Sequence, residues 1–370
     1  MASMYNVALQ VVLFSMCLVV TNSVHFSYPA VFNFGDSNSD TGEFASAKGF
    51  RPAPPNGHYF KTPSGRFCDG RLIVDFLMDA LDLPFLNAYL DSLGLPNFHQ
   101  GCNYATAGST ILPANAASIS PFGFGSQVSQ FLLFKARVLE LLAVAGKKFD
   151  EYVPAEDYFE KRLYMFDIGQ NDLAGAIYSK DLDQILSLIP TILLEFETGI
   201  KRLYDSGARN FWIHNTGPLG CLGQNVAKFG ADTSKLDEVG CLREHNQAAK
   251  AFNLHLQAFC SKLQGQYQDV NVTYVDIFTI KSNLIANYSK HGFEQPIMAC
   301  CRCGGPPLNF DSRVSCGLTT ILSNGTTIKA KGCNDSSVYV NWDGTHYTEA
   351  ANQYVASQIL TGNYSKTRQS

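Results

Sequence analysis

The chain has 370 residues, of which 46% are apolar and only 16% are charged, so it is long enough to bury one large core. Its formal net charge is −4 and it has no run of Lys and Arg, which argues against a nucleic-acid partner. No stretch beyond the first two dozen residues approaches 18 apolar residues, so we expect no stable membrane insertion of the mature chain.

The N-terminus has the pattern of a secretory signal. Residues 7–20 are almost all apolar but too few to span a bilayer comfortably, and Thr21-Asn22-Ser23 offers small residues for cleavage. No Lys or Arg precedes the apolar run, so a buried N-terminal strand or helix is the alternative. We interpret residues 1–23 as a signal peptide and residues 24–370 as a single domain.

Short apolar strands alternate with amphipathic helices along the chain. The patterns predict, in order, a strand at 30–34, a helix at 71–82, a strand at 163–168, a helix at 182–204 kinked or restarted at Pro190, a strand at 208–214, a helix at 237–263 and a strand at 272–278. This alternation predicts an α/β domain with a parallel sheet, in which sites form at the carboxyl ends of strands. Residues 51–70 are expected to form a surface loop and residues 300–336 a cysteine-stapled insertion.

Ten of the eleven cysteines lie beyond the signal. An even number in an oxidising compartment predicts up to five disulfides, and the spacing does not reveal their pairing. The dense group Cys300-Cys301-Arg302-Cys303 is spaced poorly for a zinc site, so we favour disulfides and expect no metal.

Five Asn-x-Ser/Thr sequons support a secreted protein, and each predicts a surface position if it carries a glycan. They are Asn271, Asn287, Asn324, Asn334 and Asn363.

Two short motifs near opposite ends of the chain could form one site. Gly35-Asp36-Ser37 follows the first strand, and Asp343 precedes His346 by three residues. Each motif alone also fits a simple turn or helix cap. Serine catalysis, however, needs a hydroxyl, an imidazole that takes its proton and a carboxylate that orients the imidazole.

Two further segments supply groups suited to a developing negative charge. Gly101–Ser109 is a run of small residues where backbone can approach a ligand, and Gly169–Asp172 places an amide directly after a strand. Backbone N–H groups and an Asn amide are the donors that a tetrahedral oxyanion requires.

These four segments, in this order, resemble the GDSL esterase/lipase family of the SGNH hydrolase superfamily. The matching residues are Phe34–Gly42, Asn103–Gly108, Gly169–Asp172 and Asp343–His346, and residues 64–71 and 216–221 are similar to its secreted plant branch. The chain has no Gly-x-Ser-x-Gly elbow, the mark of the other large esterase fold.

The resemblance implies a three-layer α/β/α sandwich with a mostly parallel, flavodoxin-like sheet. It implies that Ser37 is the nucleophile, that His346 is the general base and then the acid, and that Asp343 orients His346. The backbone N–H groups of Ser37 and Gly108 and the side chain of Asn171 would form the oxyanion hole. Asn38 replaces the family's name-giving Leu, and Glu43 stands where relatives often have Asn; we expect Glu43 to face solvent.

The expected activity is hydrolysis of carboxylic esters without a cofactor, with a small-molecule, lipid or polysaccharide ester as substrate. Secretion to the apoplast or cell wall follows from the signal and the plant resemblance. An acyltransferase using the same site, and a catalytically silent glycan- or partner-binding protein, are the alternatives.

Overall fold

A six-stranded sheet forms the centre of the computed structural model, which describes residues 28–61, 64–113, 120 and 122–367. The strand order is β2-β1-β3-β4-β5-β8, and all neighbours are parallel except β5 and β8. The strands are β1 (Val31–Gly35), β2 (Gly101–Asn103), β3 (Leu163–Asp167), β4 (Asn210–His214), β5 (Asn271–Val275) and β8 (Ser365–Lys366). The first five follow the flavodoxin-like order, as the resemblance implied. The expected signal, residues 1–23, lies outside the described residues.

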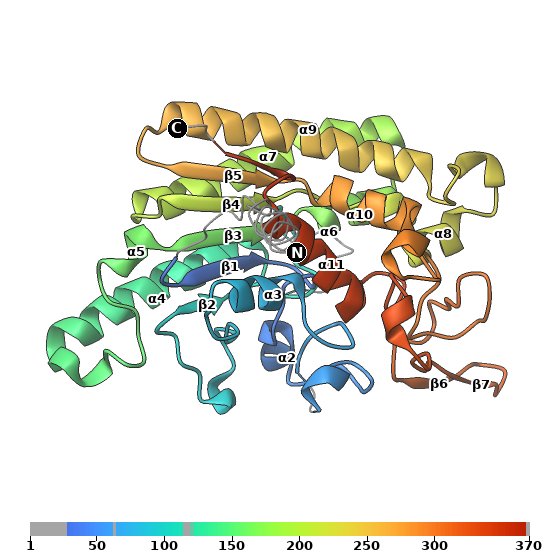
Figure 1. The fold of residues 1–370 in the computed structure, drawn as a ribbon, viewed down its shortest axis with the longest axis horizontal. Coiled ribbons are helices and arrows are strands. Elements are labelled where there is room, and N and C mark those ends of the chain that lie inside the picture. The colour runs from blue at the N-terminus through green and yellow to red at the C-terminus, as the bar shows by residue number, and fades with distance from the viewer. Residues whose placement is uncertain (1–27, 62–63, 114–119, 121, 368–370) are drawn as a thin grey trace, which may run out of the picture.

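Helices cover both faces of this sheet (Figure 1). On one face lie α4 (Phe124–Ala145), α6 (Gln170–Ile177), α7 (Leu182–Asp205) and α9 (Arg243–Gln266), and on the other lie α3 (Ile73–Ala80), α10 (Ile277–Ala286) and α11 (Glu349–Leu360). Because side chains alternate along a strand, Tyr164 packs in the first core and Met165 in the second. The three-layer α/β/α prediction is therefore confirmed.

Smaller elements complete the fold. They are α2 (Glu43–Lys48), α5 (Tyr158–Lys161), α8 (Gly223–Phe229), the hairpin β6 (Thr319–Ile321) and β7 (Thr327–Lys329), and the 3₁₀ turns His58–Phe60, Ser92–Gly94, Gly146–Phe149, Leu219–Cys221, Thr233–Lys235, Tyr288–His291 and Ser336–Val338.

Several predicted element boundaries differ from the structure. Helix α7 does not restart at Pro190 but continues through it, and Ile185, Ile189 and Phe196 on both sides of the proline pack into the same core. Strand β5 ends early because the Asp276 carboxylate accepts the N–H of Thr279 and caps α10. Helix α9 begins at Arg243 rather than at residue 237.

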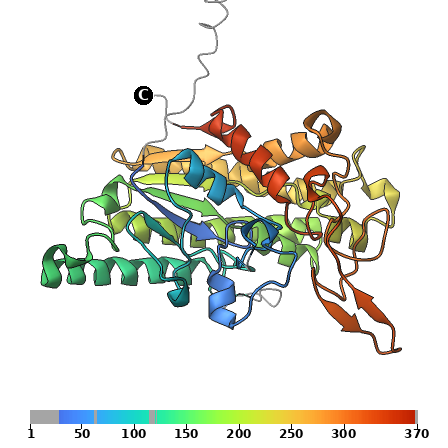
Figure 2. The same cartoon turned by 60° about the horizontal axis from the view of Figure 1, so that its bottom comes forward.

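Three disulfides are present among the described residues: Cys221–Cys241, Cys300–Cys333 and Cys301–Cys316. The last two staple the predicted insertion, which carries the β6–β7 hairpin away from the sheet (Figure 2). The remaining cysteines, Cys68, Cys102, Cys260 and Cys303, are free thiols, and the first three are buried. The sequence therefore allowed more bridges than form.

The segment 51–70 is less exposed than we expected. Arg66 is buried and its guanidinium donates to both oxygens of buried Asp75, at 2.6 and 2.8 Å. Because a buried charge needs a partner, this ion pair fixes the end of the loop against α3.

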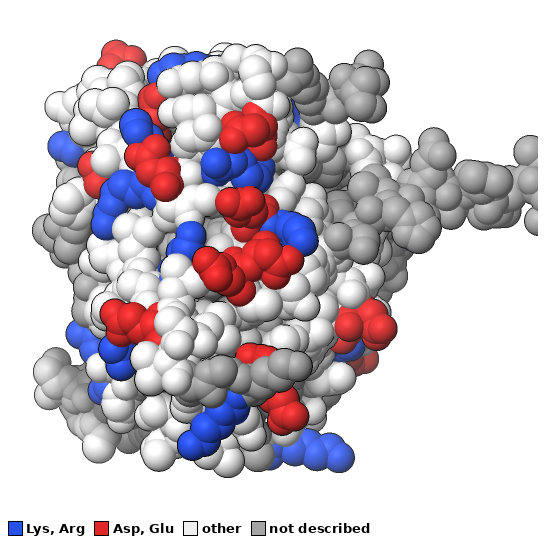
Figure 3. Space-filling view, turned by 90° about the vertical axis from the view of Figure 1, so that its left-hand side faces the viewer, with Lys and Arg blue, Asp and Glu red and all other residues white. Residues whose placement is uncertain are grey.

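Figure 3 shows the face at which the parallel strands begin. Positively and negatively charged side chains are interspersed on this face. The segments that lead into β3, β4 and β5 carry ion pairs between exposed or partly exposed side chains, which agrees with this mixing. The pairs are Lys161–Asp157, Lys201–Asp205 and Arg209–Asp269. Among the described residues, no helix is long and apolar enough to cross a membrane.

Candidate active site

Ser37 lies directly beyond the carboxyl end of β1, in a tight turn. Asp36 N–H donates to the carbonyl of Asp167 at the end of β3, and Ser39 N–H donates back to the carbonyl of Asp36. The side chain of Ser37 is only slightly accessible, with 8% of the residue exposed. The buried sheet therefore holds the hydroxyl at the edge where parallel α/β folds form sites.

The two ends of the chain meet at this hydroxyl. His346 Nε2 lies 2.8 Å from Ser37 Oγ, and His346 Nδ1 lies 2.8 Å from Asp343 Oδ2. Asp343 Oδ1 also accepts the backbone N–H of His346 at 2.9 Å. The three groups that the motifs predicted thus form one continuous hydrogen-bonded chain of the kind that activates a serine.

The Asp343 carboxyl is buried yet suited to remain ionised. Burial by itself raises its pKa, but the charge and hydrogen bonds of His346 and the charge of Arg302 outweigh burial and hold the pKa below its ordinary range. The Arg302 Nε also donates to the Asp343 carbonyl at 2.6 Å. An ionised Asp343 fixes the His346 ring with Nδ1 as donor and leaves Nε2 free to accept the Ser37 proton.

Gly108 lies on the loop after β2, and Asn171 lies in the first turn of α6, directly after β3. Gly108 has a positive φ of 77°, a conformation that favours glycine. The Asn171 amide donates to the Ser109 carbonyl at 2.9 Å and, more loosely, to Asp36 Oδ2 at 3.3 Å. Since Asp36 is the neighbour of Ser37, the amide predicted for the oxyanion lies beside the nucleophile turn.

Comparison with known proteins agrees with this geometry. Residues 31–359 match the family described as GDSL-like Lipase/Acylhydrolase. The chain belongs to this family. Two GDSL esterase/lipases of Arabidopsis thaliana are each 61% identical to it, one over 96% of this chain and 93% of its own length, the other over 93% and 90%. An esterase of Hevea brasiliensis is 44% identical over 91% of this chain and 86% of its own length.

The GDSL-like hydrolase is thus a carboxylic ester hydrolase by family, and esters are its substrates. Several of its supporting residues carry no signal of their own in the sequence. Gln127, on α4, donates to the carbonyl of Gly35 at 2.8 Å and accepts its N–H at 2.9 Å. The same amide donates to Ser109 Oγ at 3.1 Å, so it joins the turn that carries Ser37 to the Gly108 loop.

Two buried carboxylates hold the Gly108 loop from both sides. Asp40 accepts four backbone N–H groups, from Gly42, Glu43, Phe44 and Ala107. Asp172 accepts the N–H groups of Ile111 at 2.8 Å and Leu112 at 3.0 Å. Burial raises the pKa of each to about 6, and these backbone donors oppose the rise. These hydrogen bonds therefore fix the conformation of the Gly108 loop, and the residues of the motif alone do not reveal them.

The two residues that depart from the family pattern, Asn38 and Glu43, each make specific hydrogen bonds. Asn38 donates from its backbone and its side chain to Asp36 Oδ1, both at 2.9 Å. Glu43 is fully buried, so the expectation that it faces solvent was wrong: its carboxyl accepts the Leu90 N–H at 2.7 Å and faces the Gln130 amide at 3.3 Å. Burial raises the pKa of Glu43 to about 8.

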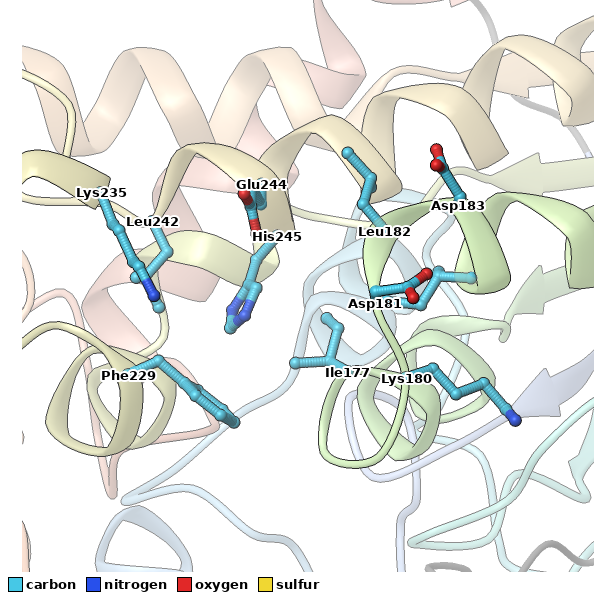
Figure 4. A pocket seen from close by; sticks show the side chains of 11 residues that line it. Ile177, Lys180, Asp181, Leu182, Asp183, Phe229, Lys235, Leu242, Glu244 and His245 are labelled. Atoms are coloured by element: carbon cyan, nitrogen blue, oxygen red, sulfur yellow. The ribbon is translucent and has the colours of Figure 1, made fainter.

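A cavity of about 500 Å³ lies apart from the triad, between the start of α7 and the loops around α8 and α9. Figure 4 shows His245 and Phe229 on one side of it and Ile177 on the other. None of Ser37, Asp343 and His346 lines it. Within the described residues, no group of three or more His, Cys, Asp or Glu side chains is arranged to hold a metal ion.

Proposed function

We propose that this protein hydrolyses carboxylic esters through an acyl intermediate on Ser37. The hydrogen-bonded chain Ser37–His346–Asp343 carries the proposal. His346 Nε2 takes the Ser37 proton as Oγ attacks the ester carbonyl, and it then gives that proton to the leaving alcohol. A water molecule, deprotonated by the same nitrogen, cleaves the acyl-serine and restores the free hydroxyl. Asp343 orients the imidazole and stabilises its charged form.

The oxyanion of each tetrahedral intermediate would be bound by the backbone N–H groups of Ser37 and Gly108 and by the Asn171 amide. The second N–H of that amide makes only a long contact to Asp36, at 3.3 Å, and is the one we assign to the oxyanion. Preorganised donors of this kind are each worth on the order of 10²–10³ in rate.

We further propose short-acyl or acetyl esters of metabolites, lipids or cell-wall glycans as substrates, outside the cell. The apolar N-terminal run, the disulfides and the five sequons support secretion to the apoplast or cell wall. Four of the sequon residues are exposed and Asn287 is partly exposed. Glycan addition at these positions is part of the same proposal.

Replacing the nucleophile tests this function. Ser37→Ala is expected to lose turnover of p-nitrophenyl acetate by at least about 10⁴-fold, with secretion and folding unchanged. Ser357→Ala, on the exposed side of α11, is the matched control. Retained turnover in Ser37→Ala would reject the nucleophile assignment.

Two further measurements separate the alternatives. With a competing sugar or hydroxy-acid alcohol present, free acid as the main product supports hydrolysis, and a dominant transfer product supports an acyltransferase. A fluorophosphonate probe should label Ser37 in the wild type, and absence of labelling would favour a silent binding protein. Acetylated xylan, triglyceride and p-nitrophenyl esters of rising length then define the substrate.

A further inference from the structure

One aromatic ring from the segment before α3 lies against the imidazole of the proposed triad. The Phe67 ring packs on His346, with the two ring centroids 5.5 Å apart and the planes tilted by 32°. Phe67 keeps part of its surface exposed, whereas Ser37 is only 8% exposed. An aromatic surface is therefore open to solvent next to the group that we assign to proton transfer.

The chain on both sides of Phe67 is anchored in the protein. Arg66 is buried in its ion pair with Asp75, and Cys68 is fully buried. The buried ring of Phe44 also packs on Phe67, with the centroids 6.0 Å apart. Because its neighbours in the chain point inward and Phe44 supports it, the Phe67 ring is held in place at the surface.

The proposed reaction places the alcohol part of the ester beside the same imidazole. In acylation, Ser37 Oγ bonds to the acyl carbon, the bond from that carbon to the alcohol oxygen breaks, and His346 Nε2 gives this oxygen the proton that it took from Ser37. The alcohol oxygen must therefore come within hydrogen-bond reach of Nε2. The rest of the alcohol then lies next to the imidazole, where the Phe67 ring is partly exposed.

We propose that Phe67 determines specificity for the alcohol part of the substrate: its ring packs against a ring of the alcohol that has an apolar face. An aryl group and a pyranose sugar both offer such a face, and packing it on Phe67 removes apolar surface from water. A short linear alcohol offers less surface for the same contact. This inference rests on the proposed esterase function and narrows it to esters of ring-bearing alcohols.

A purely structural role of Phe67 would have a different signature. His346 acts in acylation and again when water cleaves the acyl-serine, so a ring that only supports the imidazole should affect both steps and every ester alike. The acyl-serine no longer holds the alcohol. A ring that binds the alcohol should therefore affect acylation and leave deacylation unchanged.

Phe67→Ala tests the proposal with acetate esters of different alcohols. We expect kcat/KM to fall about 10-fold for phenyl acetate and less than about 3-fold for ethyl acetate, each compared with the same ester in the wild type. The rate constant for decay of acetyl-Ser37, which both esters share, should not change. Equal losses with the two esters would overturn the proposal. Phe67→Leu, which keeps an apolar side chain without a flat face, provides the same comparison if the Ala variant folds poorly.

A monoacetylated methyl xyloside distinguishes the two kinds of ring. A loss like that of phenyl acetate would support a sugar as the alcohol, and a loss confined to phenyl acetate would support an aryl alcohol. With p-nitrophenyl esters of rising acyl length, the ratio of variant to wild-type kcat/KM should stay constant, because the alcohol is the same. A loss that grows with acyl length would place Phe67 on the acyl side and overturn the proposal.

Tyr152→Ala is the matched control. Tyr152 is an exposed aromatic residue whose carbonyl accepts the Phe98 N–H just before β2 begins, at the edge of the sheet opposite the site. Its replacement should change kcat/KM for phenyl acetate and ethyl acetate by the same small factor.

A binding measurement separates failure of this inference from failure of the proposed function. In Ser37→Ala, which lacks the hydroxyl that forms the acyl-enzyme, adding Phe67→Ala should weaken phenyl acetate binding about 10-fold by titration calorimetry, with ethyl acetate binding little changed. A wild type that cleaves no ester would overturn the proposed function, and this comparison would still decide the role of Phe67. Equal phenyl acetate binding by the two variants would overturn that role and leave the esterase assignment intact.

Discussion

The proposed nucleophile side and the proposed acid–base side of this site are held in place by different means. Ser37 and the Gly108 loop rest on strand ends of the central sheet and on buried side chains that bind backbone N–H groups. Asp343 and His346 lie on a loop outside the sheet, and the stapled insertion runs alongside it.

Three consecutive hydrogen bonds join that insertion to the loop. Cys300 N–H donates to the Asn341 carbonyl and Cys301 N–H to the Trp342 carbonyl, while the Arg302 side chain donates to the Asp343 carbonyl. Cys300 and Cys301 are also disulfide-bonded to Cys333 and Cys316. The loop that carries Asp343 is thus hydrogen-bonded to a segment that two disulfides hold in place. Breaking each side should therefore have a different consequence.

The largest effect is expected when either side loses its reacting group. His346→Ala should reduce kcat by at least about 10⁴-fold, as Ser37→Ala does, and the double variant should be no worse, because the two act as a unit. Asp343→Ala should retain about 100-fold more activity, since it orients rather than transfers. Additive losses in the Ser37/His346 double variant would show that the residues do not share one step.

On the nucleophile side, Asp40→Asn should destabilise the protein by about 3 kcal/mol, because it weakens acceptance of several buried N–H groups at once. Urea unfolding measures this loss. Asp232→Asn is the control: the side chain of exposed Asp232 accepts only from Ser234, and its replacement should leave the urea midpoint nearly unchanged. Equal losses of stability in the two variants would show that Asp40 does not hold the surrounding backbone in place.

On the acid–base side, replacing Cys301 and Cys316 with Ser removes a bridge that spans a sequence separation of 15 and should cost about 3 kcal/mol. Because the Cys301 N–H donates a hydrogen bond to the carbonyl of Trp342, the residue before Asp343, kcat should fall as well. Removing Cys221–Cys241, with a separation of 20, should cost similar stability with a smaller loss of kcat. Equal kcat losses in both variants would show that the disulfide next to Asp343 has no special role in supporting the acid–base side.

The smallest effect concerns Glu43, which is buried beyond the nucleophile side. Its raised pKa means that the folded state keeps a proton which the unfolded state releases, so wild-type stability falls as pH rises toward and through about 8. Glu43→Gln removes this dependence, and the Gln130 amide can rotate to accept the new N–H group. The Tm difference between pH 6 and pH 9 should shrink by about 2 °C, whereas an unchanged difference would mean that Glu43 does not titrate in this range.

The strands were the most predictable part of the fold. Segments such as Leu163–Asp167 are short, apolar and bounded by glycine or turn residues, and these signals are local. Helices α4 and α11 and strand β2 were not predicted. Strand β2 has only three residues, and α11 alternates small and polar side chains whose burial depends on α3 and α10.

The candidate site divides in the same way. Ser37, Asp343, His346, Gly108 and Asn171 were named from four short motifs, and the family resemblance of those motifs implied their roles. Gln127 and the burial of Glu43 were not predicted, because a Gln or Glu has no distinctive neighbours in the sequence.

What the sequence determined by itself was therefore the reaction chemistry and the alternation of strands and helices, since both depend on residue types and local spacing. Only the tertiary structure decided that residues 309 positions apart share a hydrogen bond, and which cysteines pair. It also decided which carboxylates are buried against backbone N–H groups. Burial, charge balance and disulfide pairing depend on what the whole chain brings near a residue, and no short motif records that.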